Sequence, residues 1–278
     1  MEMQNGNQNI ESTENKNKIN ERLTGHYDQL TIENTYLLVG ESIEEPIEVS
    51  GGLITYSEII KDHFSNLVVV KDLPRLDFEY LENFYKEKGL PLALAINENK
   101  LSSNDKESLE KKGFKVKNKS AYMVYEGTEL NSNDKVQIQE ATTETKRNDY
   151  LEILRKVFCE GEGVYGGLST EYLDATERYF KVYPQDRRLD YIAYYEGSPV
   201  GTTSFLFNDN YAVIIAAATL PEFQKKGIAK SMISKGIEKM SGKTIFLVTE
   251  TKTVNEDIYK RMGFNTKLIE PVYIKEKI

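Results

Sequence analysis

Apolar positions along the chain form two alternating patterns, short continuous runs and helical repeats. Apolar runs bounded by turn residues predict buried strands, the clearest at 67–70, 92–96, 121–125, 200–207, 211–218 and 243–249. Amphipathic repeats predict helices over 76–85, 144–158, 170–183 and 229–240. The run 31–39, which ends in Tyr-Leu-Leu-Val, also predicts a strand. Strands that alternate with helices indicate an α/β fold, here a mixed sheet flanked by helices.

The segment 211–230 joins a strand to a helix through a loop rich in lysine. Residues 211–218 carry no charge, and Gln, two Lys and Gly follow at 224–227. The first turn of a helix leaves amide groups without partners and carries a partial positive charge, so it attracts phosphate oxygens. Gly227 and Ala229 keep the loop free of bulk where such a group would approach. The segment therefore predicts a binding site for a diphosphate.

Two motifs in this half of the chain resemble one enzyme superfamily. Thr219-Leu220-Pro221, two further residues and then Gln-x-x-Gly-x-Ala resemble the acyl-CoA signature of the GCN5-related N-acetyltransferases (GNAT superfamily). Asn-x-x-x-Tyr-x-x-x-Gly-Phe at 255–264 is similar to the closing helix and turn of that family. The chain has Gln224 where the family more often has Arg and Ala229 for the second Gly, variants that weaken the phosphate site slightly. Thr219 stands for the usual Val and is tolerable, because only its backbone is used. The resemblance implies an acyl-CoA N-acyltransferase fold and direct transfer of an acetyl group from acetyl-CoA to an amine.

The resemblance also assigns roles to individual residues. It places Tyr259 near the CoA sulfur, as the general acid that protonates the departing thiolate. The end of strand 211–218 would pair with the pantetheine as an added strand would. The expected cofactor-binding residues are Ala217, Ala218, Thr219, Gln224, Lys225, Lys226, Gly227, Ile228, Ala229, Lys230 and Asn255. For Asn255 two interpretations stay open, because its amide could bond to the cofactor or cap the helix.

The general base has no clear motif, because the strand 211–218 contains no carboxylate. Glu250, just after the strand 243–249, is one candidate. Glu160 and Glu162, in a glycine-rich loop, are the others, and they would favour a cationic amine if they line the acceptor site. Each of the three is also compatible with an ordinary solvated surface position.

The N-terminal half carries a looser version of the same order of elements. Its Gly113-Phe114 after a helix echoes Gly263-Phe264, and the half resembles the degenerate first module of tandem acetyltransferases. It lacks a Gln-x-x-Gly-x-Ala loop, so we expect no CoA there. An unrelated α/β module is the alternative. The predicted organisation is a disordered or loosely docked tail at 1–22, a degenerate, smaller partial copy at 23–130 and a catalytic domain at 134–278.

Composition narrows the class of partner. A net charge of −8 and a pI near 5.1 argue against a general nucleic-acid binder. No apolar run is long enough to predict a membrane span. Cys159 is the only cysteine, which fits a reducing cytoplasm, and with no His nearby it is expected to be a small buried hydrophobe. His26 and His63 are the only histidines, so a Cys/His zinc site is not expected. Carboxylate metal sites stay open, but no calcium-loop spacing is present, and no residue is assigned to a metal.

The expected partner is therefore a small-molecule or peptide amine, with acetyl-CoA as cosubstrate. Monomer and homodimer both stay open. A CoA-binding or ligand-sensing protein that has lost turnover is the main alternative function. An aminoacyl-transferring enzyme of the peptidoglycan type shares such a duplicated fold, but its tRNA substrate calls for a basic groove, which the acidic balance disfavours.

Overall fold

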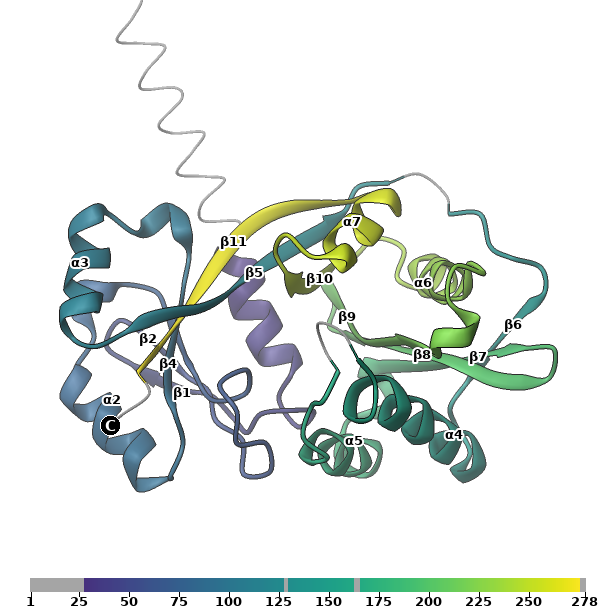
Figure 1. Ribbon diagram of the computed structural model, residues 1–278, viewed down its shortest axis with the longest axis horizontal. Coiled ribbons are helices and arrows are strands. Elements are labelled where there is room, and N and C mark those ends of the chain that lie inside the picture. The colour runs from purple at the N-terminus through teal and green to yellow at the C-terminus, as the bar shows by residue number, and fades with distance from the viewer. Residues whose placement is uncertain (1–27, 128–129, 163–165, 276–278) are drawn as a thin grey trace, which may run out of the picture.

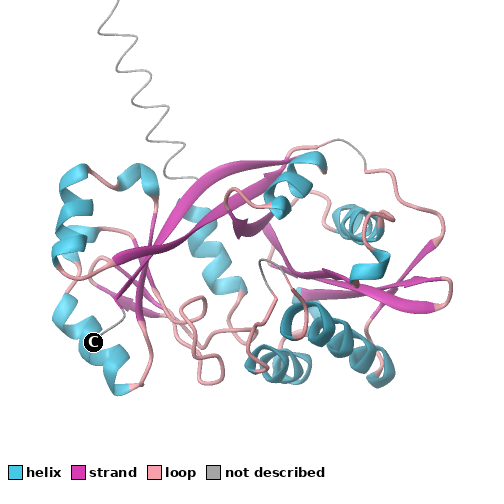
Figure 2. Cartoon of the chain, viewed as in Figure 1, coloured by secondary structure: helices cyan, strands magenta, loops and turns pink. Residues whose placement is uncertain are grey.

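One mixed, twisted β-sheet runs through the protein, with helices on both faces (Figure 1, Figure 2). The computed structural model describes residues 28–127, 130–162 and 166–275. Within them the sheet has 11 strands in the order β1-β2-β3-β4-β11-β5-β10-β9-β8-β7-β6. The neighbours β3/β4 and β9/β10 are parallel, and the other pairs are antiparallel. The predicted fold class, a mixed twisted sheet flanked by helices, is confirmed.

The N-terminal half supplies five strands and two helices after a helical segment at 28–37. The strands are β1 (Ile47–Val49), β2 (Gly52–Ile54), β3 (Val68–Val70), β4 (Leu92–Ile96) and β5 (Lys115–Tyr125). The helices are α2 (Phe78–Glu87) and α3 (Ser103–Lys111), with 3-10 turns at Leu73–Arg75 and Glu98–Lys100. The Asp77 carboxylate accepts a hydrogen bond from the first turn of α2, so an acid occupies the helix end that a phosphate would need.

The C-terminal half supplies the remaining strands and four helices. The strands are β6 (Val136–Glu140), β7 (Arg188–Tyr195), β8 (Ser198–Phe207), β9 (Tyr211–Thr219), β10 (Thr244–Glu250) and β11 (Phe264–Lys275). The helices are α4 (Glu144–Leu154), α5 (Glu171–Val182), α6 (Ile228–Lys239) and α7 (Val254–Arg261). A π-helical turn (Arg155–Cys159) follows α4, and 3-10 turns lie at Gln185–Arg187 and Pro221–Phe223. Helices α4 and α5 pack on one face of the sheet, and α6 and α7 pack on the other (Figure 1).

Strands β5 and β11 cross between the two halves. β5, which ends the N-terminal half, lies between β11 and β10, whereas β11 lies between β4 and β5. Their antiparallel ladder is long and runs from Phe264↔Tyr125 to Ile274↔Lys115. The predicted division at 130–134 falls in the connection between β5 and β6, so each half completes the sheet of the other. The division into two domains stays a prediction.

The prediction of a strand at 31–39 is wrong, because residues 28–37 are helical. Leu30, Thr31, Thr35 and Leu37 are buried on one side of this helix, and the Thr35 hydroxyl bonds to the carbonyl of Thr31, one turn earlier. Threonine and isoleucine in the run gave a strand-like composition, but packing against the face that carries α4 and α5 decides the conformation. The tail predicted at 1–22 lies outside the described residues.

None of the helices in the described ranges is long and apolar enough to cross a membrane.

Candidate active site

Strands β9 and β10 separate at their carboxyl ends. They pair in parallel from Tyr211↔Thr244 to Ile214↔Leu247 and no further. Beyond this point β9 continues along β8 to Thr219, while β10 continues along β5 to Glu250. Two backbone edges, 215–219 and 248–250, therefore diverge from one another. An extended ligand with amide groups could add to such an edge as a further strand does.

A β-bulge turns the end of β9. Ala216 has a left-handed φ of 52°, and the β8/β9 register shifts between Thr202 and Ser204. Thr202 Oγ1 donates to the Ala216 carbonyl at 3.1 Å, so a side chain of β8 bonds to the bulged residue. Of the predicted residues, Ala217 lies in the bulge and Ala218 directly follows it, so the bulge changes the direction of their backbone groups. Sequence reasoning missed the bulge, since only the strand register reveals it.

The loop after β9 presents the N-terminus of α6. Gly227 is the N-cap, with a left-handed φ of 76°, and no side chain of the described residues caps the helix there. Asn133 fixes the loop, because its Nδ2 donates to the Lys226 carbonyl at 2.8 Å. The first-turn amides of α6 are thus left for an external acceptor, which is the arrangement that binds phosphate groups.

Helix α6 approaches the strands closely at its first turn. A Cβ at Gly201 would lie 2.9 Å from the Ala218 carbonyl oxygen and 3.0 Å from the Ile228 side chain. Glycine at this position therefore lets the helix end sit beside the end of β9. The Ile228 side chain is itself buried against Ala193 and Val200, so only its backbone can contribute to ligand binding.

The other predicted residues of the loop differ in what they offer. Thr219 Oγ1 is buried and has no hydrogen-bond partner in the part of the chain that the structure describes. Such an orphaned hydroxyl at the strand end fits a site that a polar ligand completes. Lys225 is exposed, but the Lys226 ammonium lies 4.7 Å from the centre of the Phe223 ring and 5.1 Å from that of Tyr195. These cation–π contacts hold the Lys226 ammonium over the two rings, whereas the Lys225 side chain makes no such contact among the described residues.

Three more predicted residues adjoin the loop. Gln224 Nε2 donates to the Thr219 carbonyl at 3.4 Å, so this side chain ties the loop to the end of β9. Ala229 and Lys230 lie in the first turn of α6, and both are half-buried.

Tyr259 lies on α7, on the same face of the sheet as α6. Its half-buried ring meets Phe264 edge-on, with ring centres 5.9 Å apart, and packs in the same apolar cluster as Ala229. Asn255 is in the first turn of α7, but Thr253 is the N-cap, because its hydroxyl accepts from the Glu256 amide at 3.4 Å. The capping interpretation of Asn255 is therefore wrong.

The acidic candidates lie on two separate segments. Glu250 is the last residue of β10, half-buried and opposite Ser120 of β5. Glu160 and Glu162 are exposed on the segment after the π-helical turn, and residues 163–165 lie outside the described residues. Burial raises the pKa of the half-buried Cys159 thiol, which disfavours the thiolate and agrees with a structural role.

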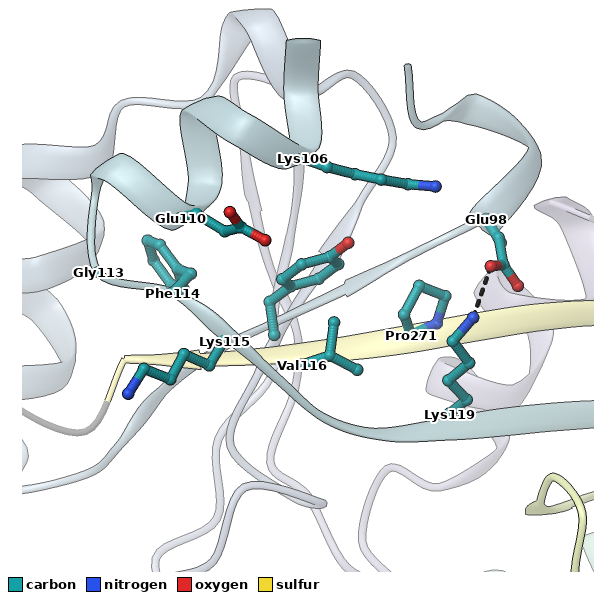
Figure 3. Close-up of a pocket in the computed structure, with 10 residues that line it drawn as sticks. Glu98, Lys106, Glu110, Gly113, Phe114, Lys115, Val116, Lys119 and Pro271 are labelled. Carbon is teal, nitrogen blue, oxygen red and sulfur yellow. Dashed lines mark hydrogen bonds and ion pairs between the residues drawn. The ribbon is translucent and has the colours of Figure 1, made fainter. Parts of the chain in front are cut away.

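Two further observations concern metal sites and a second cavity. The residues that the structure describes contain no group of three or more His, Cys, Asp or Glu side chains that could hold a metal ion. A cavity of about 600 Å³ opens beside α3 and the far ends of β5 and β11 (Figure 3). Its wall includes Lys119, which points to the opposite face of β5 from Ser120. This cavity is separate from the divergence of β9 and β10.

Comparisons with known proteins agree with this geometry. Residues 153–264 match the family model described as the acetyltransferase (GNAT) family. No curated protein matches the chain. Among solved structures, a functionally unknown conserved protein from Staphylococcus epidermidis is similar over 84% of this chain and 93% of its own, with 20% identity and a TM-score of 0.68.

Two similar structures bear names of the same kind. A GCN5-related N-acetyltransferase from Kribbella flavida has 12% identity over 89% of this chain and 95% of its own, with a TM-score of 0.64. A tandem GNAT protein from the clavulanic acid biosynthesis pathway has 8% identity over 81% of this chain and 78% of its own, with a TM-score of 0.56. At such identities the structures establish the fold, and residues 153–264, in the C-terminal half, carry the match to the acetyltransferase (GNAT) family model.

Proposed function

We propose that the protein is an acetyl-CoA-dependent N-acetyltransferase that moves the acetyl group directly to an amine. The observation that carries this proposal is the divergence of β9 and β10 directly beside the uncapped N-terminus of α6. One feature accepts an extended amide chain and the other accepts phosphate oxygens, and CoA combines both groups in one molecule. The orphaned Thr219 hydroxyl supports the same placement.

Acetyl-CoA would supply an activated acetyl thioester at the divergence. The backbone edge of β9 from the bulge to Thr219 would bind the pantetheine arm, and the loop 224–230 would hold the diphosphate. Tyr259 would donate its phenolic proton to the leaving sulfur. Glu250, on the other strand of the divergence, would take the proton that the attacking amine loses.

Calorimetric titration with acetyl-CoA tests the cofactor site, using the wild type and Gly227→Glu. A Cβ at Gly227 meets only the Asn133 Cβ, at 3.7 Å, so there is room for the side chain. A carboxylate about 4 Å from a phosphate costs roughly 4 kcal/mol near a protein surface, and we expect affinity to fall by about 1,000-fold. Gly242→Glu is the matched control, because Gly242 also has a left-handed φ, of 86°, and nothing lies within 4 Å of its Cβ.

The outcomes separate the competing functions. Binding that Gly227→Glu abolishes and Gly242→Glu retains supports the site, and release of thiol on adding amines then supports the transferase. Binding without turnover of any amine favours the alternative, a CoA-binding sensor. If the wild type binds no acetyl-CoA, the proposed function is wrong.

A further inference from the structure

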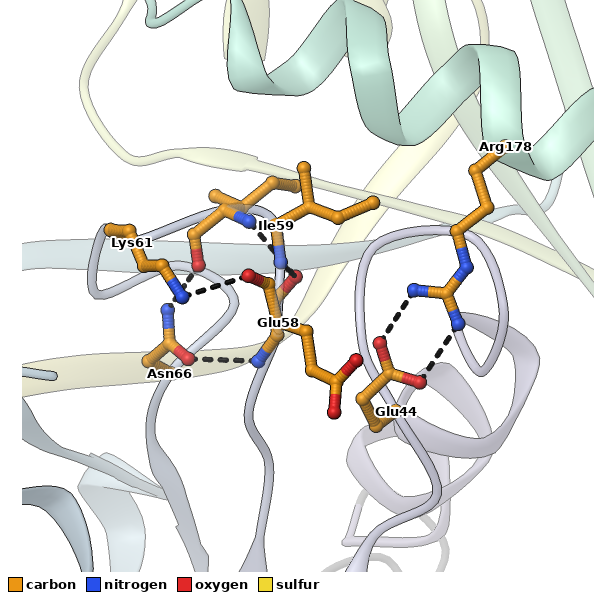
Figure 4. Close-up of polar contacts among 8 residues, drawn as sticks. Glu44, Glu58, Ile59, Lys61, Asn66 and Arg178 are labelled. Atoms are coloured by element: carbon orange, nitrogen blue, oxygen red, sulfur yellow. Dashed lines mark hydrogen bonds and ion pairs between the residues drawn. The ribbon is translucent and has the colours of Figure 1, made fainter. Parts of the chain in front are cut away.

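A rigid loop of the N-terminal half lies at the junction with the C-terminal half. This junction loop, residues 57–66, is organised around the fully buried Asn66. The Asn66 amide accepts from the Ser57 backbone N–H at 2.8 Å and donates to the carbonyls of Ile60 and Asp62 at 2.8 and 2.6 Å. Figure 4 shows Asn66 beneath the turn that carries Ile59 and Lys61. A surface loop fixed by a buried polar side chain is a suitable support for a binding site.

The junction loop is fixed to α5 as well. The Tyr172 hydroxyl donates to Asp62 Oδ2 at 2.5 Å, and the Lys61 amide donates to Glu171 Oε2 at 3.0 Å. Nearby, Arg178 forms a two-pronged ion pair with Glu44, at 2.6 and 2.9 Å (Figure 4). The N-terminal half is therefore held in place beside the helices that cover the Glu250 face of the sheet.

Strand register places the junction loop on the same face of the sheet as Glu250. His63 Nε2 lies 3.3 Å from Asn118 Oδ1, on β5. Asn118 and Ser120 point to one face because side chains alternate along a strand, and Ser120 lies directly opposite Glu250. His63 therefore lies on the face of the sheet that Glu250 also faces, and its partner Asn118 is two residues along β5 from Ser120.

The junction loop presents an aromatic surface there. Phe64 is 48% exposed, and its ring stacks on the His63 imidazole with centres 4.2 Å apart and planes tilted by 32°. Partial burial lowers the pKa of His63, so the imidazole is neutral at neutral pH and adds no charge to repel an ammonium group. The junction loop thus exposes a flat aromatic pair on the same face of the sheet as the Glu250 carboxylate.

We infer that the junction loop selects the acceptor, and that the acceptor is a primary amine on an aromatic body. The charge of Glu250 attracts the ammonium end, and the His63–Phe64 pair holds the ring. The inference rests on the proposed function and names the acceptor class for that same site. The N-terminal half thereby contributes to specificity without binding CoA itself.

Steady-state acetylation of tyramine and of butylamine tests the inference, with Phe64→Ala as the variant. Tyr80→Ala is the matched control, since Tyr80 is an aromatic residue of the same half, 46% exposed and on α2. We expect a lower KM for tyramine than for butylamine in the wild type. Phe64→Ala should raise the tyramine KM by roughly tenfold, with the butylamine KM, kcat and the acetyl-CoA Kd unchanged.

Each result has a defined meaning. Equal KM values for the two amines in the wild type, or acetylation of neither by a protein that binds acetyl-CoA, overturn the acceptor class. Equal effects of Phe64→Ala and Tyr80→Ala overturn the role of the loop. Failure of the wild type to bind acetyl-CoA contradicts the proposed function, which is a separate result.

Discussion

Replacing Gly236 by alanine tests how closely α6 is seated on the sheet. Glycine in a helix interior costs about 0.8–1.0 kcal/mol relative to alanine, so propensity alone predicts that Gly236→Ala stabilises the protein. The structure predicts the opposite sign. A Cβ at Gly236 would lie 2.0 Å from Phe205 Cζ and 2.1 Å from Phe205 Cε2.

The magnitude follows from the size of this clash. Carbon atoms in good contact are about 3.5–4.0 Å apart, so the helix or the ring must move by about 1.5 Å. Phe205 is fully buried and cannot swing into solvent. Overpacking of this kind costs about 1–3 kcal/mol, and the upper end applies here. After the gain in helix propensity, we expect the free energy of unfolding to fall by about 2 kcal/mol.

Urea denaturation of the wild type, Gly236→Ala, Phe205→Leu and the double variant measures the effect. If the clash is the cause, the smaller leucine side chain relieves it, and the double variant loses about 1–2 kcal/mol less than the sum of the single changes. A neutral or stabilising Gly236→Ala, or strict additivity in the double variant, would show that α6 is not seated on Phe205 as described.

Two other predictions concern the site and a buried carboxyl. Tyr259→Phe should lower kcat by about 100-fold with the acetyl-CoA Kd unchanged; an unchanged kcat rules out the phenol as general acid. Burial raises the pKa of Glu270 from 4.5 to about 7. Between these pH values the folded state keeps a proton that the unfolded state loses, so the contribution of Glu270 to the free energy of unfolding falls by about 3 kcal/mol from pH 4.5 to 7. In Glu270→Gln the amide oxygen can still accept from the Tyr122 hydroxyl. Urea titrations at several pH values should show a smaller fall in the free energy of unfolding for this variant than for the wild type, and identical pH profiles contradict the prediction.

The strand, loop and helix of the proposed cofactor site could be predicted from the sequence because they are contiguous. The strand, Gln224, Gly227 and the helix follow one another, so one local motif contains the whole turn. The long β5 could not be predicted in full. Only 121–125 has a strand-like apolar run, whereas the polar stretch from Lys115 is extended because β11 pairs with it.

The proposed acceptor side of the site has no local signal in the sequence. The contact of His63 with Asn118 joins residues 55 positions apart, and Glu250 meets Ser120 through the register of two strands. As a single histidine with no neighbouring Cys or His, His63 carries no signal of its own. Tertiary pairing places His63 and Glu250 on one face of the sheet, and sequence periodicity does not encode such pairing.

The crossing of β5 and β11 has a consequence for the order of folding. β11 is synthesised after every other described strand, and until it emerges β4 and β5 each keep an open edge. A nascent chain of this protein therefore exposes two unpaired strands for most of its synthesis, which invites pairing with a second nascent chain. Pairing of β11 covers both of these open edges, so a change that unpairs β11 should expose the edges of β4 and β5 together.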